Sequence, residues 1–242
     1  TNPGDDDGPA DLYSGHGTHV SSIIAADYPW DVGGFYGIAP AVDLISVAAF
    51  DANGQGTYMD VIRGIDFVVT YKDKLNIRVL NLSLSAEPKS FYWDDPLNQA
   101  VMAAWQAGIV VVASAGNTGP EPMTIGVPGN VPYVITVGAM TDSYTPDDPS
   151  DDALASFSST GPTVEGFVKP EVLAPGGHIL GLMDPMSSLA KAYPNFYVDQ
   201  KYYFEMSGTS QAAGVVSGVA ALILQADPTL SADDVKCRIM SA

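Results

Sequence analysis

An unbroken run of apolar residues at 109–113 (IVVVA) is the feature of this sequence that most restricts its fold. Strands with one solvent-exposed face alternate apolar and polar residues, whereas strands buried on both faces of a parallel sheet are apolar throughout. We therefore predict that residues 109–113 form an interior strand of a parallel sheet. Such a sheet needs helices over both of its faces.

The rest of the chain alternates between strand-like and helix-like segments. Strands are expected at 42–47, 77–84 and 133–137, and helices at 58–71 and 96–107. This alternation predicts an α/β fold with a doubly wound, mostly parallel sheet and helices on both faces. With 242 residues, of which 46% are hydrophobic, we expect one large domain spanning residues 1–242 with a sizeable core.

Composition excludes several classes of protein. The chain carries 10 basic and 28 acidic residues, a net charge of −18, and phosphate binding needs a basic surface, so we expect no nucleic-acid partner. No apolar run reaches the roughly 20 residues needed to span a membrane. The first residues are polar and acidic, unlike a signal peptide. Cys237 is the single cysteine, so no internal disulfide can form.

Acidic residues gather in two places, at residues 5–7 and in the segment 141–152. The second group comprises Asp142, Asp147, Asp148, Asp151 and Asp152. Such clusters are either a solvated surface or oxygen ligands for calcium, and the sequence leaves both interpretations open.

The segment 14–20 (SGHGTHV) is the first motif with catalytic potential. Glycines on both sides of His16 permit a tight turn and leave space beside the imidazole, whose ordinary pKa suits proton transfer near neutrality. The alternative is that His16 and His19 bind a metal. The zinc-binding HExxH pattern is absent, however, and the chain contains only one further histidine, His178.

Two more motifs place polar side chains where ligands commonly bind. Asn117 follows the predicted strand 109–113, and ligand groups collect at the carboxyl ends of parallel strands. Ser210 begins a helix-like segment that is apolar nearly all round, and the start of a helix favours a negatively charged oxygen. The alternatives are an ordinary turn asparagine and a serine that only caps the helix.

Together the segments GHGTHV, SAGN and SGTS resemble the subtilisin (subtilase) family of serine peptidases, whose catalytic elements run in the order Asp, His, Ser. The resemblance implies that Ser210 is the nucleophile, that His16 is the general base and then the general acid, and that Asn117 and the backbone N–H of Ser210 bind the oxyanion. It also implies a secreted enzyme that acts on protein or peptide substrates, needs no cofactor for its chemistry and has structural calcium in some members. An esterase of the α/β-hydrolase type needs a second glycine after the serine, where this chain has Ala212.

The resemblance further implies a set of substrate-binding residues. Around the first pocket on the acyl side (S1) these are Ser83, Leu84, Ser85, Ala113, Ser114, Ala115 and Gly126, with Tyr58 near S4. Their side chains are uncharged and mostly small or apolar, so we expect a weakly selective preference for bulky apolar residues at P1.

This sequence departs from the family pattern at three places. Gln211 and Gly214 stand where the family often has Met and Pro. No catalytic Asp in an apolar strand precedes His16, so we expect a domain that is incomplete at its N-terminus. The Asp is then supplied by an N-terminal segment or a second chain. The alternative is a catalytically silent module derived from a subtilase.

Overall fold

The computed structural model describes residues 14–28, 35–51, 53–145, 147–198 and 202–241. The α-helices are α1 (His16–Ala25), α2 (Tyr58–Leu75), α3 (Pro96–Gln106), α4 (Ser188–Ala192), α5 (Thr209–Ala226) and α6 (Ala232–Met240), and the 3₁₀ helices are η1 (Pro149–Asp151) and η2 (Pro194–Phe196). The strands are β1 (Asp27–Tyr28), β2 (Phe35–Tyr36), β3 (Val79–Leu82), β4 (Val110–Ser114), β5 (Ile135–Thr141), β6 (Ala153–Leu154), β7 (Val172–Pro175), β8 (Ile179–Leu182) and β9 (Tyr203–Met206).

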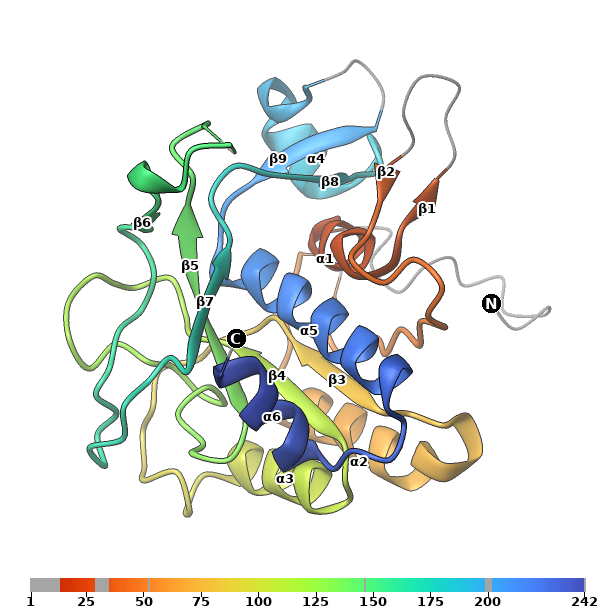
Figure 1. The fold of residues 1–242 in the computed structure, drawn as a ribbon, viewed down its shortest axis with the longest axis vertical. Helices are drawn as coiled ribbons and strands as arrows, with labels where there is room; N and C mark the ends of the chain where they lie inside the picture. Colours follow the sequence, from red (N-terminus) through yellow and green to blue (C-terminus); the bar gives the residue numbers. More distant parts are fainter. Residues whose placement is uncertain (1–13, 29–34, 52, 146, 199–201, 242) are drawn as a thin grey trace.

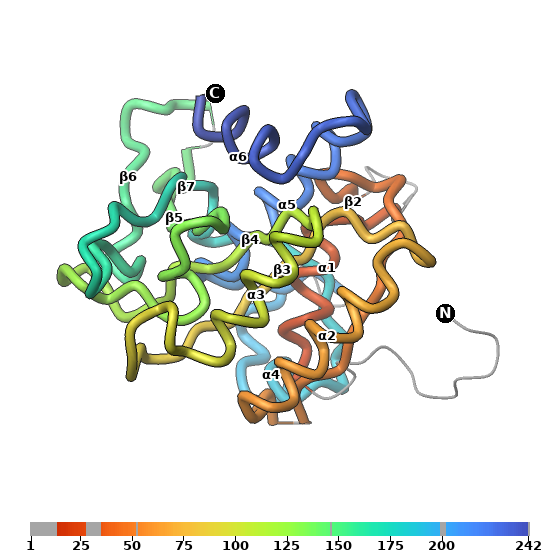
Figure 2. The backbone as a smooth tube through the Cα atoms, turned by 90° about the horizontal axis from the view of Figure 1, so that it is seen from below, coloured from red at the N-terminus to blue at the C-terminus, as the bar shows by residue number. Residues whose placement is uncertain are grey.

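A mostly parallel sheet forms the centre of the molecule. Strands β3, β4, β5 and β7 run parallel in that order, and β6 pairs antiparallel with the end of β5. Every residue of β4 is buried, which confirms the interior strand predicted from residues 109–113. Helix α5 packs against β3, β4, β5 and β7, while α2 and α3 pack on the opposite side of the sheet (Figures 1 and 2). The fold is therefore the predicted α/β arrangement.

Side-chain caps explain where two of the predicted helices begin. Thr57 accepts a hydrogen bond from the Asp60 N–H, and the Asp60 carboxylate accepts one from the Thr57 N–H. Asp95 accepts hydrogen bonds from two N–H groups in the first turn of α3, with Pro96 at the first helical position. Helix α2 runs four residues beyond the predicted end at 71 and stops where Asn76 adopts a left-handed conformation.

The strand expected at 42–47 does not form in the described part of the chain. Residues 43–49 have no regular secondary structure, and Leu44, Ile45 and Val47 are all exposed. A strand requires a neighbouring backbone to accept and donate its hydrogen bonds, and none of the described segments pairs with these residues. These residues favour a strand locally, but no neighbouring strand is available among the described residues.

Helix α5 is the most apolar long helix among the described residues. By length and composition alone its segment Thr209–Ala226 could cross a membrane, but 61% of that segment is buried inside the protein. The small residues along it explain this burial, because they permit close packing. A Cβ at Gly218 would lie 2.5 Å from the Ile38 Cβ, so any side chain there would push Ile38 away.

Candidate active site

The first turn of α5 presents Ser210 at the carboxyl end of the sheet. The helix begins after Gly208, which makes no side-chain cap, so Ser210 is not the capping residue. Ser210 is 8% exposed. Its Oγ donates to the Ser83 carbonyl at 3.4 Å, and the Ser83 hydroxyl donates to the Ser210 carbonyl at 2.8 Å. The segment after β3 therefore holds Ser210 from one side.

Asn117 is oriented by Thr209, the residue before Ser210. The Thr209 N–H and the Thr209 hydroxyl both donate to Asn117 Oδ1, each at 2.9 Å. Because a backbone N–H can only donate, the oxygen of the amide must face Thr209, and the NH₂ group must point elsewhere. Asn117 is exposed, so its NH₂ group is available to an oxyanion. Sequence reasoning missed Thr209, which appeared only as a spacer within the motif.

Helix α1 begins at His16, directly after a glycine that no other residue could replace without strain. Gly15 has φ +91°, and a Cβ at this position would lie 2.7 Å from Ser187 Oγ. His16 itself is half-buried. The glycine thus permits the tight turn predicted from the GHG pattern.

His19 is a buried structural residue. Its Nε2 lies 2.9 Å from the Phe204 carbonyl and its Nδ1 lies 3.4 Å from Gln211 Nε2. Burial lowers the pKa of His19 from 6.5 to about 4, so the ring is neutral near neutrality. Nε2–H then donates to Phe204, and Nδ1 accepts from the Gln211 amide. Both ring nitrogens have protein partners, which excludes the metal-ligand alternative for His19.

Close packing of α1 on α5 brings His16 and Ser210 to the same end of the molecule. His19 touches Gln211 in the first turn of α5, and Val20 touches Gly214 in the next. A Cβ at Gly214 would lie 3.3 Å from Val20 Cγ1, so glycine here permits the close approach of the two helices. This gives a physical reason for the departure from the family's Pro.

Most of the residues expected around S1 lie together beside Ser210. Ser114 Oγ donates to the Leu84 carbonyl at 3.0 Å, and the Gly126 N–H donates to the Ala115 carbonyl at 3.0 Å. The Ser85 hydroxyl lies against Gly116 and Gly126, where a Cβ on either glycine would crowd it. These contacts form an uncharged wall of small residues.

Three of the residues expected around S1 are buried. Ala113, Ser114 and Ala115 are at most 2% exposed, so their side chains do not line a surface in the described structure. Tyr58 donates to Asp95 Oδ2 at 3.3 Å, and partial burial, followed by the Asp95 charge, raises the pKa of Tyr58 to about 12. The Tyr58 hydroxyl is thus directed at the cap of α3, and its expected place near S4 stays a prediction.

Acidic side chains of the segment 141–152 cap their own turns. Asp142 accepts from the Tyr144 N–H, Asp148 from the Ser150 N–H, and Asp151 from the Thr145 hydroxyl. Within the described ranges no three His, Cys, Asp or Glu side chains gather as metal ligands. The arrangement therefore does not fit a calcium site at this loop, and the other acidic group, residues 5–7, lies outside the described residues.

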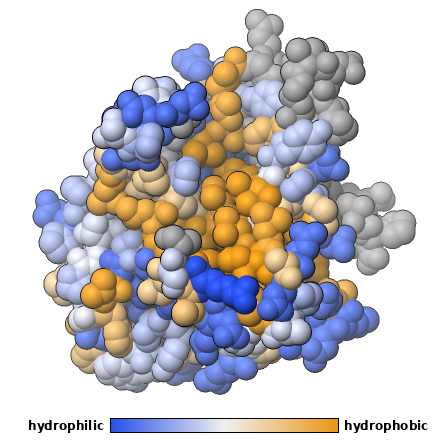
Figure 3. All heavy atoms as spheres, viewed as in Figure 1, coloured by the Kyte–Doolittle hydropathy of each residue, from blue (hydrophilic) through white to orange (hydrophobic). Residues whose placement is uncertain are grey.

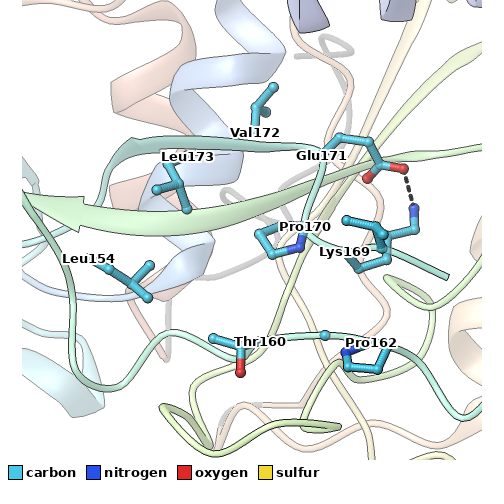
Figure 4. A pocket seen from close by; sticks show the side chains of 10 residues that line it. Leu154, Thr160, Pro162, Lys169, Pro170, Glu171, Val172 and Leu173 are labelled. Atoms are coloured by element: carbon cyan, nitrogen blue, oxygen red, sulfur yellow. Dashed lines mark hydrogen bonds and ion pairs between the residues drawn. The ribbon is translucent and has the colours of Figure 1, made fainter. Parts of the chain in front are cut away.

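A surface groove of about 540 Å³ lies beside β7 and away from these residues (Figure 4). Leu154, Thr160 and Leu173 line it, together with the Lys169–Glu171 ion pair. Glu171 also pairs with Lys236 of α6, whose ammonium contacts three carbonyl oxygens of residues 132–134. These buried ion pairs fasten α6 to the sheet, and neither His16, Asn117 nor Ser210 lines the groove.

The arrangement of a serine at a helix start, a donor amide beside it and a histidine on the adjoining helix has counterparts among known proteins. A model of the subtilase family (peptidase S8) matches residues 1–242. This chain belongs to the subtilase family. The match agrees with the resemblance carried by the three motifs, and the chemistry of subtilases needs no cofactor.

Curated relatives of this subtilase are named as serine proteases or subtilisins of Bacillus. Serine protease AprX of Bacillus subtilis (strain 168) is 42% identical over 228 residues, which are 92% of this chain and 51% of AprX. Subtilisin DY of Bacillus licheniformis is 36% identical over 94% of this chain and 70% of its own length. The chain thus spans about half of AprX.

Solved structures show the same fold. Sphericase superimposes with a TM-score of 0.78 at 27% identity, covering 94% of this subtilase and 69% of Sphericase. The S41 psychrophilic protease superimposes with a TM-score of 0.76 at 28% identity, again covering 94% and 69%.

Proposed function

We propose that residues 1–242 form a single catalytic domain of a serine endopeptidase that hydrolyses peptide bonds in protein or peptide substrates. The observation that carries the proposal is the pair of hydrogen bonds from Thr209 to Asn117 Oδ1. They direct the amide NH₂ of Asn117 away from Thr209, beside the turn that presents Ser210.

The proposed mechanism gives each of the three residues one role, as the family resemblance implies. Ser210 Oγ attacks the carbonyl carbon of the scissile bond while His16 takes the hydroxyl proton. Negative charge then develops on the substrate oxygen, where the Asn117 amide and the Ser210 N–H donate to it. His16 passes its proton to the leaving amine, and water hydrolyses the acyl-enzyme by the same steps.

Substrate preference on the acyl side is set by the wall around Ser85, Gly116 and Gly126. The wall contains no charged side chain, and its glycines pack directly against the Ser85 hydroxyl. We propose that apolar P1 residues are preferred with modest selectivity, because apolar contacts separate similar side chains only weakly. As in the family, we propose that the protein acts outside the cell.

An apolar surface beside β3 indicates that a further strand completes the site. Within the described residues β3 pairs only with β4, and its other edge is open. Apolar side chains gather over α5 and β3 in the middle of this face (Figure 3). Ile38 packs against Gly218 of α5, and Leu222 of the same helix lines a shallow groove with Val42. Leu44 and Ile45 follow Val42 in the chain and are exposed. An open edge beside an apolar surface is a costly combination in water.

We propose that the occupant is a strand from a preceding segment of the full-length protein, or from a second chain, that ends in the catalytic Asp. It would hydrogen-bond to β3 and cover Leu44 and Ile45. Its carboxylate would hold the His16 imidazole in the required tautomer. A catalytically silent module remains the alternative, and measured activity separates the two proposals.

Kinetics of the full-length protein on a peptide with an apolar P1 residue test the proposal. We expect Ser210→Ala to lower kcat by about 10⁶-fold and Asn117→Ala by about 10²–10³-fold, the magnitudes known for the corresponding residues of a subtilisin. Ser156→Ala and Asn195→Ala, both at exposed positions, serve as matched controls and should change kcat less than about twofold. Wild-type protein without hydrolysis would favour the silent module.

A further inference from the structure

The turn at residues 176–178, which follows β7, packs directly against the turn that presents Ser210. The Gly208 N–H donates to the Gly176 carbonyl at 2.8 Å, and the His178 N–H donates to Ser207 Oγ at 2.9 Å. In the sheet, β3 and β7 lie on opposite sides of β4 and β5. The turn 176–178 therefore lies on the side of Ser210 opposite to Ser83.

An exposed aromatic pair stands on this turn. The rings of Tyr144 and His178 are stacked, with centroids 4.0 Å apart and an angle of 30° between their planes. Tyr144 comes from the loop after β5 and remains 65% exposed. Tyr144 and His178 both have positive φ, at +65° and +57°, a conformation that side chains rarely adopt. Packing of the loop against the turn holds both residues in this conformation, since a Cβ at Gly177 would lie 2.7 Å from Thr141 Cβ.

Negative charge surrounds the aromatic pair. Glu205 of β9 pairs with Leu180 of β8, two residues after His178, and Asp142 precedes Tyr144 by two residues. Desolvation of the phenol, followed by the charges of Glu205 and Asp142, raises the pKa of Tyr144. Asp142 accepts a hydrogen bond from the Tyr144 N–H at 3.1 Å. Neither carboxylate takes part in an ion pair within the described part of the chain. An open tyrosine face beside two unpaired carboxylates is suited to a cationic side chain.

We propose that Tyr144, His178 and Glu205 form a subsite for the leaving-group side of the substrate, which prefers arginine or lysine just after the cleaved bond. The inference rests on the proposed peptidase function and extends it. The wall around Ser85 lies on the acyl side, so the remaining half of the substrate must run past the opposite side of Ser210. A guanidinium there stacks on Tyr144 and faces Glu205. The net charge of −18 attracts such substrates further.

The test compares peptides that are identical on the acyl side and carry arginine, or its neutral isostere citrulline, at the first or second position after the cleaved bond. For the full-length protein we expect kcat/KM to be about tenfold higher with arginine at one of these positions, and lower at high salt. The arginine-to-citrulline ratio should fall towards one in Tyr144→Ala and in Glu205→Gln. Tyr193→Ala, another exposed tyrosine, is the matched control and should keep the ratio.

Equal kcat/KM values for the two peptides in the wild type would overturn the subsite while leaving the peptidase function intact. A wild-type preference that persists in both Tyr144→Ala and Glu205→Gln would also overturn it, because the preference would then arise elsewhere. Failure to cleave any peptide would overturn the proposed function, and this inference with it.

Discussion

His19 joins three elements that support the proposed catalytic residues. It belongs to α1, contacts the Phe204 carbonyl in β9, and contacts Gln211 next to Ser210 in α5. Gly181 of β8 lies directly over the ring, where a Cβ would be 2.7 Å from Nε2. Both ring nitrogens have protein partners, and burial disfavours the charged ring, so His19 stabilises the fold in its neutral form.

Stability should therefore depend on pH through His19. Its pKa is about 4 when folded, against 6.5 for an unperturbed histidine such as that of the unfolded chain, so the unfolded chain binds the extra proton between these values. The contribution is fully present above pH 6.5 and is lost as the pH falls through 4, a change of about 3 kcal/mol. Denaturant titrations of the full-length protein between pH 4 and 7 measure it. His19→Gln should be less stable at pH 7 and should lose less stability on acidification, whereas an equal pH slope in both proteins would contradict the assignment.

The open edge of β3 is the main feature at the scale of elements. Leu44 is 52% exposed in the described structure, although it lies in a segment whose composition predicts a buried strand. A strand that pairs with β3 would cover it. The same would apply to Ile45 and Val47 in this segment.

Mutation of Leu44 distinguishes a covered from an uncovered surface. If a strand occupies this place in the full-length protein, Leu44→Ala should lower the free energy of unfolding by about 2–4 kcal/mol, the usual cost of truncating a buried leucine. Val168→Ala is the matched control, because Val168 is 88% exposed, and it should change stability by less than about 0.5 kcal/mol. Equal small effects of both substitutions in thermal or denaturant unfolding would show that no strand covers Leu44.

Across the whole molecule, features that depend on local sequence could be predicted, whereas features that depend on long-range contacts could not. The apolar run at 110–113 and the caps Thr57 and Asp95 act within a few residues, so the interior strand and the helix starts could be predicted. The family motifs likewise predict His16, Asn117 and Ser210 as catalytic residues, and these roles stay predictions. The contact between Thr209 and Asn117 joins residues 92 positions apart, and the contact between His19 and Gln211 joins residues 192 positions apart. No local sequence pattern encodes either contact. The prediction of a strand at 42–47 was wrong for the same reason, because strand pairing depends on a partner that is distant in the sequence.

The central claim is that Ser210 is the activated nucleophile of a serine peptidase, and covalent labelling tests it most directly. The full-length protein is treated with a fluorophosphonate, and the modified residue is located by mass spectrometry of its peptides. We predict one phosphonyl group per chain on Ser210, formed more slowly in Asn117→Ala because an oxyanion donor is lost, and absent from Ser210→Ala. Labelling of a different serine, or full labelling that persists in Ser210→Ala, would contradict the account.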